Sequence, residues 1–366
     1  MMYLQNLSLI NFKNYSQAEL QLSQKINCFV GNNGGGKTNI LDAIFYLSFC
    51  KSYFNSVDSQ NIKHGENFFV IQGTYKKDES TETIYCGVKQ DHEKQFKRNK
   101  KVYEKLSDHI GLLPLVMVSP SDIELISEGS EERRRFINSV ISQYDKQYLE
   151  DVIKYNRALK QRNTILKEFA RRGNFDRESI EIWDEILITL GSSIYKKRLD
   201  FIEKLVPVFQ KYYDFVSLGN EKVELIYESQ LHHNNLRSLL NSSLEKDRII
   251  QHTSVGIHKD DLMLNLSGFP IKKIGSQGQN KTFLIALKFA QFEFIKNING
   301  YKPILLLDDI FDKLDNQRVK QIIKLVVDNN FGQIFISDTS KERIVNILSD
   351  IEIEYNIFTV SNGEVQ

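Results

Sequence analysis

The stretch that decides the fold of this chain reads Gly31-Asn32-Asn33-Gly34-Gly35-Gly36-Lys37-Thr38. It satisfies the complete pattern G-x-x-x-x-G-K-[ST], whose backbone N–H groups wrap a polyphosphate. An apolar segment at 26–30 precedes the stretch and is typical of a buried strand, and Ile40 and Ile44 follow at the spacing of one helix face. Strand, glycine loop and helix in this order predict a nucleotide-binding loop rather than a simple glycine-rich turn.

The loop itself indicates which groups bind the nucleotide. We expect its whole backbone, from Gly31 to Thr38, to surround the phosphates, with added positive potential from the following helix N-terminus. Lys37 has the length to reach the β- and γ-phosphates and is a candidate catalytic residue, and the Thr38 hydroxyl is a candidate ligand of Mg²⁺. The predicted cofactors are therefore ATP and Mg²⁺.

Two carboxylates end an apolar stretch far downstream. Residues 304–307 are Ile-Leu-Leu-Leu, and they precede Asp308 and Asp309. In a protein with a phosphate loop, we expect Asp308 to hold Mg²⁺, directly or through water, and Asp309 to polarise the water that attacks the γ-phosphate. A strand that ends in acids is a weak signal alone, and the phosphate loop makes it a strong one.

Between these two motifs lies a third, Ser276-Gln277-Gly278-Gln279, followed by a helical pattern that includes Leu284 and Leu287. A serine and a glycine at a helix N-terminus form a cradle for an anion. The alternative is a serine that only caps the helix. Because the phosphate loop already has its own acid for Mg²⁺, we expect the cradle to complete the nucleotide site of a second copy of the chain.

These three motifs, in this order, resemble the ABC-type ATPases, and smaller motifs narrow the resemblance to the bacterial RecF family of DNA replication and repair proteins. The smaller motifs lie at 11–15, 119–122, 132–136, 159–163 and 256–262, and as Lys313-Leu314-Asp315 after the two acids. The resemblance covers nearly the whole chain. It implies an α/β fold, the ABC-type, SMC-like ATPase head with a mixed sheet and helices, which carries an inserted helical arm lobe.

The resemblance also implies roles for single residues. Lys13 and Asn14 would lie beside the nucleotide. Ser276, Gly278 and Gln279 would bind the nucleotide of a head-to-tail partner, whose phosphate loop faces them.

Three departures from the pattern of related heads bear on hydrolysis. Position 13 is Lys where related heads usually carry Arg, and an ammonium group does not form the bidentate contact of a guanidinium. The second acid is Asp309 rather than the Glu of ABC transporters, and no histidine follows the segment 333–336, where Ser337-Asp338-Thr339 stands. A shorter base and a missing histidine favour slow hydrolysis that is used for timing.

The function implied by the resemblance is an ATP-gated clamp of recombinational DNA repair and replication restart. ATP would join two heads into a homodimer on duplex DNA at single-strand gaps. A weak, DNA-dependent ATPase activity would then act as the switch that opens the dimer. The clamp would help a recombinase replace single-strand-binding protein and would support the SOS response to DNA damage, with RecR as a partner and RecO in the same pathway.

Two other functions share the phosphate loop. The ATPase subunit of an ABC transporter would need a membrane partner, a switch histidine and a much shorter distance between the loop and Ser276. The ATPase part of a nuclease system would carry a metal-dependent nuclease domain after the ATPase, and this sequence ends at Gln366, soon after Asp315. We therefore favour the clamp.

The pattern of residues along the chain indicates three parts. Residues 1–120 form the N-terminal part of the ATPase lobe, with antiparallel strands expected at 68–71 and 83–88. Residues 121–252 form a helical arm, because apolar residues recur every three or four positions from 131 to 172 and again to a point near Pro207. Residues 253–366 complete the ATPase with the serine cradle and the two acids.

The composition sets the limits for partners and compartment. The chain has 366 residues and a formal net charge of +1, so any DNA-binding face must be local. Its three cysteines lack the spacing of a metal site and fit a reducing compartment. A secretory leader and a membrane-spanning run are not recognisable, so we expect a cytoplasmic protein with no membrane partner.

The densest basic segment lies at 94–101. We predict that Lys97, Arg98, Lys100 and Lys101 contact DNA phosphates, with Phe96 or Tyr103 beside the sugar–phosphate path. A solvated hairpin tip is an equal alternative. The arginines at 133–135 are expected to form at least one internal ion pair, and the basic residues at 171–172 and 196–198 are expected to be solvated helix faces.

Overall fold

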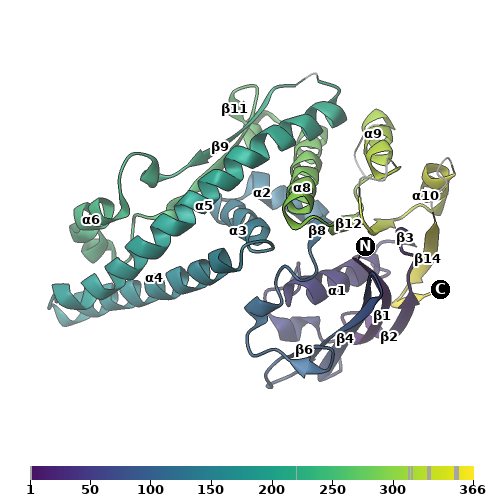
Figure 1. Ribbon diagram of the computed structural model, residues 1–366, viewed down its shortest axis with the longest axis horizontal. Coiled ribbons are helices and arrows are strands. Elements are labelled where there is room, and N and C mark those ends of the chain that lie inside the picture. Colours follow the sequence, from purple (N-terminus) through teal and green to yellow (C-terminus); the bar gives the residue numbers. More distant parts are fainter. Residues whose placement is uncertain (1, 220, 312–313, 315, 328–330, 350–353) are drawn as a thin grey trace. The chain divides into compact units, whose positions relative to one another are not determined.

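The computed structural model describes all residues except 1, 220, 312–313, 315, 328–330 and 350–353 (Figure 1). Lys313 and Asp315, in the predicted motif after the two acids, lie outside the described residues. The chain forms two compact units. The first comprises Met1–Ile123, Tyr212–Gly219 and Ser276–Gln366, and the second comprises Glu124–Lys211 and Asn220–Gly275. The predicted division at residues 120 and 252 stays a prediction.

The first unit is built around a sheet in the order β15-β14-β3-β13-β12-β8. Its centre is parallel and fully buried, and consists of β3 (Ile26–Val30), β13 (Ile334–Asp338) and β12 (Ile304–Asp308). The outer strands are β8 (Leu115–Val118), β14 (Tyr355–Ser361) and β15 (Glu364–Val365). Because parallel strands end at the same edge, the sheet brings the start of the phosphate loop close to the two acids.

An antiparallel sheet belongs to the same unit, in the order β2-β1-β4-β5-β6-β7. Its strands are β1 (Met2–Phe12), β2 (Tyr15–Gln21), β4 (Phe68–Lys77), β5 (Ser80–Lys89), β6 (Gln95–Arg98) and β7 (Lys101–Val102). The strands predicted at 68–71 and 83–88 are confirmed within β4 and β5. Helix α1 (Lys37–Phe49) contacts strands of both sheets, so the helix that follows the phosphate loop is anchored in their shared core.

Among the described residues, three further helices lie entirely in the first unit. Helix α8 (Gln277–Asn299) packs on β8, and the predicted apolar positions Leu284 and Leu287 are buried. Helix α9 (Asn316–Val327) precedes β13, and α10 (Lys341–Leu348) lies between β13 and β14 in the sequence. Short 3₁₀ helices are η1 (Asp58–Asn61), η2 (Leu106–Asp108) and η3 (Pro120–Ile123).

The second unit is mainly helical. Its helices are α2 (Glu124–Ser127), α3 (Ser130–Ile141), α4 (Lys146–Arg172), most of α5 (Arg177–Ser217), α6 (Leu236–Ile250) and α7 (Ile271–Ile274), with 3₁₀ turns η4 (Gln230–His232) and η5 (Ile257–Lys259). A small antiparallel sheet consists of β9 (Val223–Glu228), β10 (Asp261–Leu266) and β11 (Phe269–Pro270).

The helical tracts differ from their predicted extents. The tract from 131 to 172 is two helices, because the extended residue Asp145 starts a new one by accepting a hydrogen bond from the Tyr148 N–H (2.8 Å). Helix α5 does not end near Pro207 but continues to Ser217. Pro207 removes one hydrogen bond to the carbonyl of Glu203, and Glu203 is exposed, so water can replace that bond.

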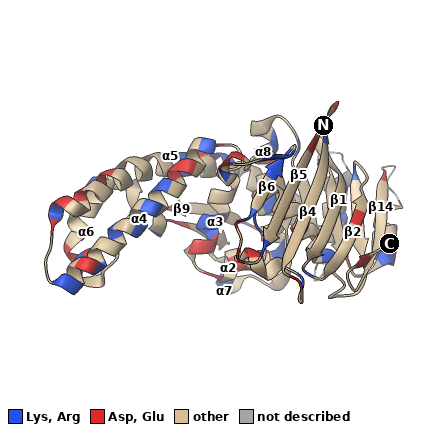
Figure 2. Ribbon diagram, turned by 90° about the horizontal axis from the view of Figure 1, so that it is seen from below, with Lys and Arg blue, Asp and Glu red and all other residues tan. Residues whose placement is uncertain are grey.

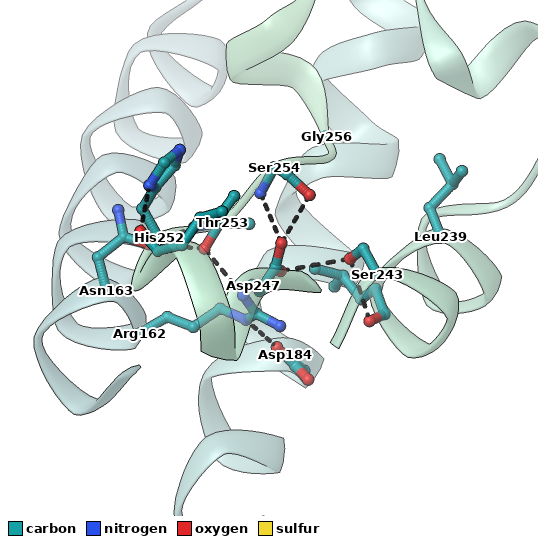
Figure 3. A network of polar contacts seen from close by, with 12 residues as sticks. Arg162, Asn163, Asp184, Leu239, Ser243, Asp247, His252, Thr253, Ser254 and Gly256 are labelled. Carbon is teal, nitrogen blue, oxygen red and sulfur yellow. Dashed lines mark hydrogen bonds and ion pairs between the residues drawn. The ribbon is translucent and has the colours of Figure 1, made fainter. Parts of the chain in front are cut away.

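A buried arginine joins three helices of the second unit (Figure 3). Arg162 of α4 is fully buried, and its Nε donates to Asp184 of α5 (2.6 Å). Its Nη1 donates to Asp247 of α6 (2.8 Å) and to the Thr253 hydroxyl (2.9 Å). Asp247 also accepts hydrogen bonds from the N–H (2.9 Å) and hydroxyl (2.6 Å) of Ser254. The network therefore fixes the loop after α6 as well as the three helices.

Among the predicted solvated basic residues, Arg198 is a correction. Its side chain is only 2% exposed, and its Nη1 donates to Asp260 (2.8 Å) inside the second unit. A buried guanidinium needs such partners, and a sequence pattern does not reveal them. The predicted internal pair in the 133–135 run is confirmed, since Arg135 pairs with Glu131 (2.6 Å) and Glu132 (2.5 Å).

A membrane was not expected as a partner. In the described part of the chain, none of the helices combines the length and the apolar character needed to cross a bilayer.

Candidate functional site

The phosphate loop connects β3 to α1 through backbone conformations that favour glycine. Gly31 has a φ of 151° and Gly36 a φ of 120°. A Cβ on Gly31 would lie 2.1 Å from the carbonyl oxygen of Val360, and one on Gly36 would lie 2.6 Å from the Asn14 side chain. The glycines are therefore required by close backbone packing as well as by the turn.

Lys37 is the first residue of α1, and only 4% of it is exposed. Its Nζ donates hydrogen bonds to the carbonyl oxygens of Gly31 (2.8 Å) and Asn32 (3.1 Å), two residues of the loop itself. The loop thus holds the ammonium group in place before any ligand contributes. A preorganised cation of this kind favours polyphosphate, because little ordering of the side chain remains to be done.

The two halves of the predicted site meet at Asp308, the last residue of β12. Its Oδ1 accepts hydrogen bonds from the hydroxyls of Thr38 (2.9 Å) and Ser337 (2.7 Å). Burial raises the pKa of Asp308 above its ordinary value, and the bonds from Ser337 and Thr38 oppose that rise. A hydroxyl and a carboxylate oxygen this close are the hard ligands that Mg²⁺ takes from a protein when phosphates supply the others.

Asp309 follows directly and is only half-buried. It has a φ of 44°, and its N–H donates to the Ser337 hydroxyl (2.9 Å), while its carbonyl accepts from Lys281 Nζ (3.2 Å). The left-handed backbone turns the chain sharply just after β12.

A pocket of about 530 Å³ lies beside both carboxylates within the first unit. It is lined by the two predicted acids, by Asn33 of the phosphate loop, and by Gln277 at the start of α8. A volume of this size is in the range of small-molecule sites.

Residues 13–15, at the turn between β1 and β2, support the loop. Asn14 Nδ2 donates to the carbonyl of Gly35 (3.0 Å), and the Tyr15 hydroxyl donates to the carbonyl of Gly36 (3.0 Å). The Lys13 ammonium forms an ion pair with the buried Asp42 of α1 (2.6 Å). Asn14 therefore contacts the loop, and nucleotide contacts by Lys13 and Asn14 both stay predictions.

Ser276 is exposed and caps α8. Its hydroxyl oxygen accepts from the Gln279 N–H (3.2 Å), and the Gln279 side chain accepts from the Ser276 N–H (2.8 Å), which completes a capping box. Gly278 lies in the same turn, where an added Cβ would stand 3.1 Å from Arg318 Nη1. The capping role is thus present in the single chain, and the serine hydroxyl still has its hydrogen to donate.

The predicted DNA-binding residues lie on the hairpin of β6 and β7. Lys100 forms part of the turn, with a φ of 69°, and both Lys100 and Lys101 are exposed. Arg98 makes two hydrogen bonds with Glu82, each 2.7 Å long, and the Lys97 ammonium lies 5.1 Å from the centre of the Tyr85 ring. The hairpin therefore presents fewer uncompensated charges than its sequence suggests.

Of the two rings predicted beside a sugar–phosphate path, Phe96 is excluded by its burial, and Tyr103 stays a prediction. The Phe96 side chain is 1% exposed and packs edge-on against the His109 ring, with 4.8 Å between ring centres. Alternation along β6 turns Phe96 towards the core, while the basic residues follow it towards the turn.

Sequence reasoning missed the role of Ser337. In the sequence the residue stands out only because it occupies the place of a histidine, yet its hydroxyl bonds both the Asp308 carboxylate and the Asp309 N–H. The feature that could have revealed this role is a hydroxyl residue near the end of a buried strand that neighbours β12. Ser119, which directly follows β8 on the other side of β12, is a weaker case, with its hydroxyl 3.5 Å from Asp308 Oδ2.

Comparison with known proteins bears on the whole chain. The family model described as RecF/RecN/SMC N terminal domain matches residues 3–365. Relatives called DNA replication and repair protein RecF include those of Phocaeicola vulgatus, 54% identical over 100% of this chain and 98% of the relative, and Flavobacterium johnsoniae, 51% identical over 98% and 100%.

Solved structures give the same result for the fold. One described as the recombination mediator protein RecF-ATP in the RecFOR pathway has a TM-score of 0.89 and 32% identity, and covers 100% of this chain and 97% of that one. An Smc head domain from Pyrococcus furiosus has a TM-score of 0.60 and 18% identity, and covers 100% of this chain and 96% of that one. At this identity the likeness shows a shared fold alone. The predicted ATPase-head fold is confirmed, and the chain belongs to the RecF family of DNA replication and repair proteins.

Proposed function

We propose that the protein is an ATP-dependent DNA-binding switch, in which ATP pairs two heads on duplex DNA at single-strand gaps. The observation that carries the proposal is the 2.9 Å hydrogen bond from Thr38 to Asp308, which joins the phosphate loop to the acid 270 residues away. A solved relative described as RecF-ATP supports the choice of nucleotide.

Thr38 and Asp308 are the residues that would hold Mg²⁺, and their oxygen ligands fit that ion. When bound, Mg²⁺ would neutralise charge on the phosphates. Lys37 would contact the β- and γ-phosphates, and the backbone from Gly31 to Gly36 would surround them. Asn14 would act indirectly, because it bonds the loop backbone at Gly35.

Asp309 would accept a proton from the attacking water. Its carboxylate is at the pocket and only half-buried, so water can reach it. With Ser337 in the place of a histidine, no imidazole assists at that point, and hydrolysis would be slow. A weak ATPase of this kind acts as a timer for release.

Ser276, Gly278 and Gln279 would bind the γ-phosphate of a partner head. The serine hydroxyl already accepts from its own helix, so its proton remains for a phosphate oxygen. Only ATP presents that oxygen, and a ligand shifts an association equilibrium only through such differential contacts. ATP would therefore favour the homodimer, and ADP would not.

The cellular role follows from the family. A solved relative described as a recombination mediator protein in the RecFOR pathway supports the choice of this pathway. Within it, we propose RecR as a direct partner and RecO in the same process, with recombinase loading at gaps and the SOS response as outcomes. Lys97, Lys100 and Lys101 are the hairpin residues left for DNA phosphates, since Arg98 is paired with Glu82. A cytoplasmic location is part of the same proposal.

Sedimentation of the protein with ATP, ADP and no nucleotide tests the dimer. Ser276→Arg should bind ATP as a monomer but not dimerise, because bulk and positive charge fill the cradle. Ser242→Arg, which changes an exposed serine of α6, is the matched control and should dimerise like the wild type.

Mixing Ser276→Arg with Lys37→Met sharpens this test. Neither variant should dimerise alone, whereas one arrangement of the mixed dimer keeps a complete site made of one chain's loop and the other chain's cradle. ATP should therefore restore part of the dimer in the mixture. ATP-induced dimers of Ser276→Arg at wild-type strength would show that the serine is only a helix cap.

A further inference from the structure

Helix α4 of the second unit carries a line of four cations, Arg157, Lys160, Lys167 and Arg171, which we call the α4 stripe. All four are exposed. At about 100° of rotation per residue they fall within an arc of about 80°, and they extend over about 21 Å of the helix axis. Figure 2 shows Lys and Arg recurring along this helix. The stripe is thus a linear basic surface on a rigid element.

The rest of α4 explains why the stripe is fixed in orientation. The helix buries Tyr148, Tyr155 and Leu166, which lie on the face opposite the stripe. Arg162, in the same buried face, is held by the network of Figure 3. The four cations therefore take no part in the core, and replacing them leaves the packing of α4 intact.

The acidic residues close to the stripe are already neutralised. Glu150 and Glu168 border it on α4, and they pair with Lys154 (3.4 Å) and Arg172 (3.7 Å). None of the four cations of the α4 stripe forms an ion pair with a described residue.

Several acids of the neighbouring helices are also paired, whereas Glu178 and Glu203 of α5 are exposed and form no ion pair among the described residues. On α5, Glu181 pairs with Arg177 (2.8 Å), and Glu185 pairs with Arg237 of α6. On α6, Glu245 pairs with Arg248 (2.9 Å). Most acids around the stripe are thus paired, so a net positive field remains along it, although the whole chain has a net charge of only +1.

We propose that the α4 stripe is a contact surface for the phosphate backbone of duplex DNA. A small anion would need cations that converge on one point, whereas this line suits a polymer with one charge per ~1.7 Å of its axis. The α4 stripe consists of Lys and Arg and contains no aromatic side chain that could stack on a base. It would therefore bind phosphates without reading the base sequence. The inference rests on the proposed function and adds a second DNA-contacting surface, on the helical unit, to the hairpin.

The test is a salt titration of binding to a labelled duplex, with ATP present. The variant Arg157→Ala/Lys160→Ala/Lys167→Ala/Arg171→Ala should bind more weakly, and the slope of log K against log salt should shrink by about 0.9 for each phosphate that a cation no longer neutralises. With one phosphate for each of the four cations, the total decrease in slope is about 3.6. Its thermal unfolding and its ATP-induced dimer should remain as in the wild type.

The matched control is Arg135→Ala/Arg177→Ala/Lys204→Ala/Arg237→Ala, which removes four exposed cations of α3, α5 and α6 that are all ion-paired. It changes the net charge equally and should keep the wild-type slope. An unchanged slope for the stripe variant, or an equal decrease for the control, would overturn the α4 stripe while leaving the proposed function in place. If the wild type bound no duplex, the proposed function would fail and the stripe with it.

Discussion

At the residue scale, Asp308 and Asp309 are adjacent in sequence but differ in environment. Asp308 is 3% exposed and held by two hydroxyls, whereas Asp309 is half-buried at the pocket. A fixed, buried carboxylate is suited to hold a cation, and one that water reaches is suited to accept a proton. The environments thus support the different roles proposed for the two acids.

Asp309→Asn should slow ATP hydrolysis by about 10²- to 10⁴-fold, the usual contribution of a positioned general base. Asparagine tolerates the left-handed backbone at this position, where φ is 44°, so the turn after β12 should survive. Single-turnover hydrolysis measures the rate, and calorimetry should show ATP binding retained through Lys37, Thr38 and Asp308. If Asp309→Asn hydrolysed ATP at the wild-type rate, another group would have to accept the proton of the attacking water.

At the element scale, the helices of the second unit depend on charges that are hidden from water. Arg162 and Asp247 are both fully buried, and their hydrogen bond joins α4 to α6. Removing one partner leaves the other charge without compensation in a site that water does not reach.

Arg162→Ala should therefore destabilise the second unit by about 3–5 kcal/mol. Trp183 of α5, the only tryptophan of the chain, reports on this unit, so urea unfolding followed by its fluorescence is the direct measurement. Lys154→Ala breaks an exposed pair on the same helix and should cost about 0–1 kcal/mol. Equal effects of the two substitutions would contradict the structural role of the buried network.

At the scale of the whole molecule, stability should depend on pH through the buried imidazole of His109. His109 lies in the core of the first unit, where its Nε2 contacts the carbonyl of Leu47 (2.7 Å) and its Nδ1 the Tyr103 hydroxyl (3.0 Å). Burial lowers the pKa of His109 from 6.5 to about 4, and nearby Arg98 acts in the same direction.

Between pH 6.5 and about 4 the unfolded chain therefore binds a proton at this position that the folded chain does not, so stability falls as the pH falls. His109 alone should cost on the order of 2 kcal/mol between pH 7 and pH 5. His109→Gln should reduce this loss of stability in thermal unfolding measured at the two pH values, and the exposed His64→Gln should not. An identical pH dependence for His109→Gln and the wild type would rule out the buried imidazole as its source.

The sequence by itself determined the nucleotide loop, the strand before it, the helix after it and the strand that ends in Asp308. Each of these is encoded by neighbouring residues: glycines that permit positive φ, an unbroken apolar run, or apolar positions at helical spacing. The order of the motifs was enough to indicate the ATPase-head fold and the RecF family. Local chemistry and its order are properties of the chain before it folds.

Only the tertiary structure decided which polar residues are partners. A charged residue looks the same in the sequence whether it is solvated or buried, so the sequence does not distinguish the buried Arg198 from a solvated cation, nor the core-facing Phe96 from an exposed ring. Ser337 reaches Asp308 because β12 and β13 are parallel neighbours, although the two residues are 29 positions apart in the sequence. Ion pairs and hydrogen bonds of this kind join distant segments, and their geometry exists only once the sheets and helices have packed.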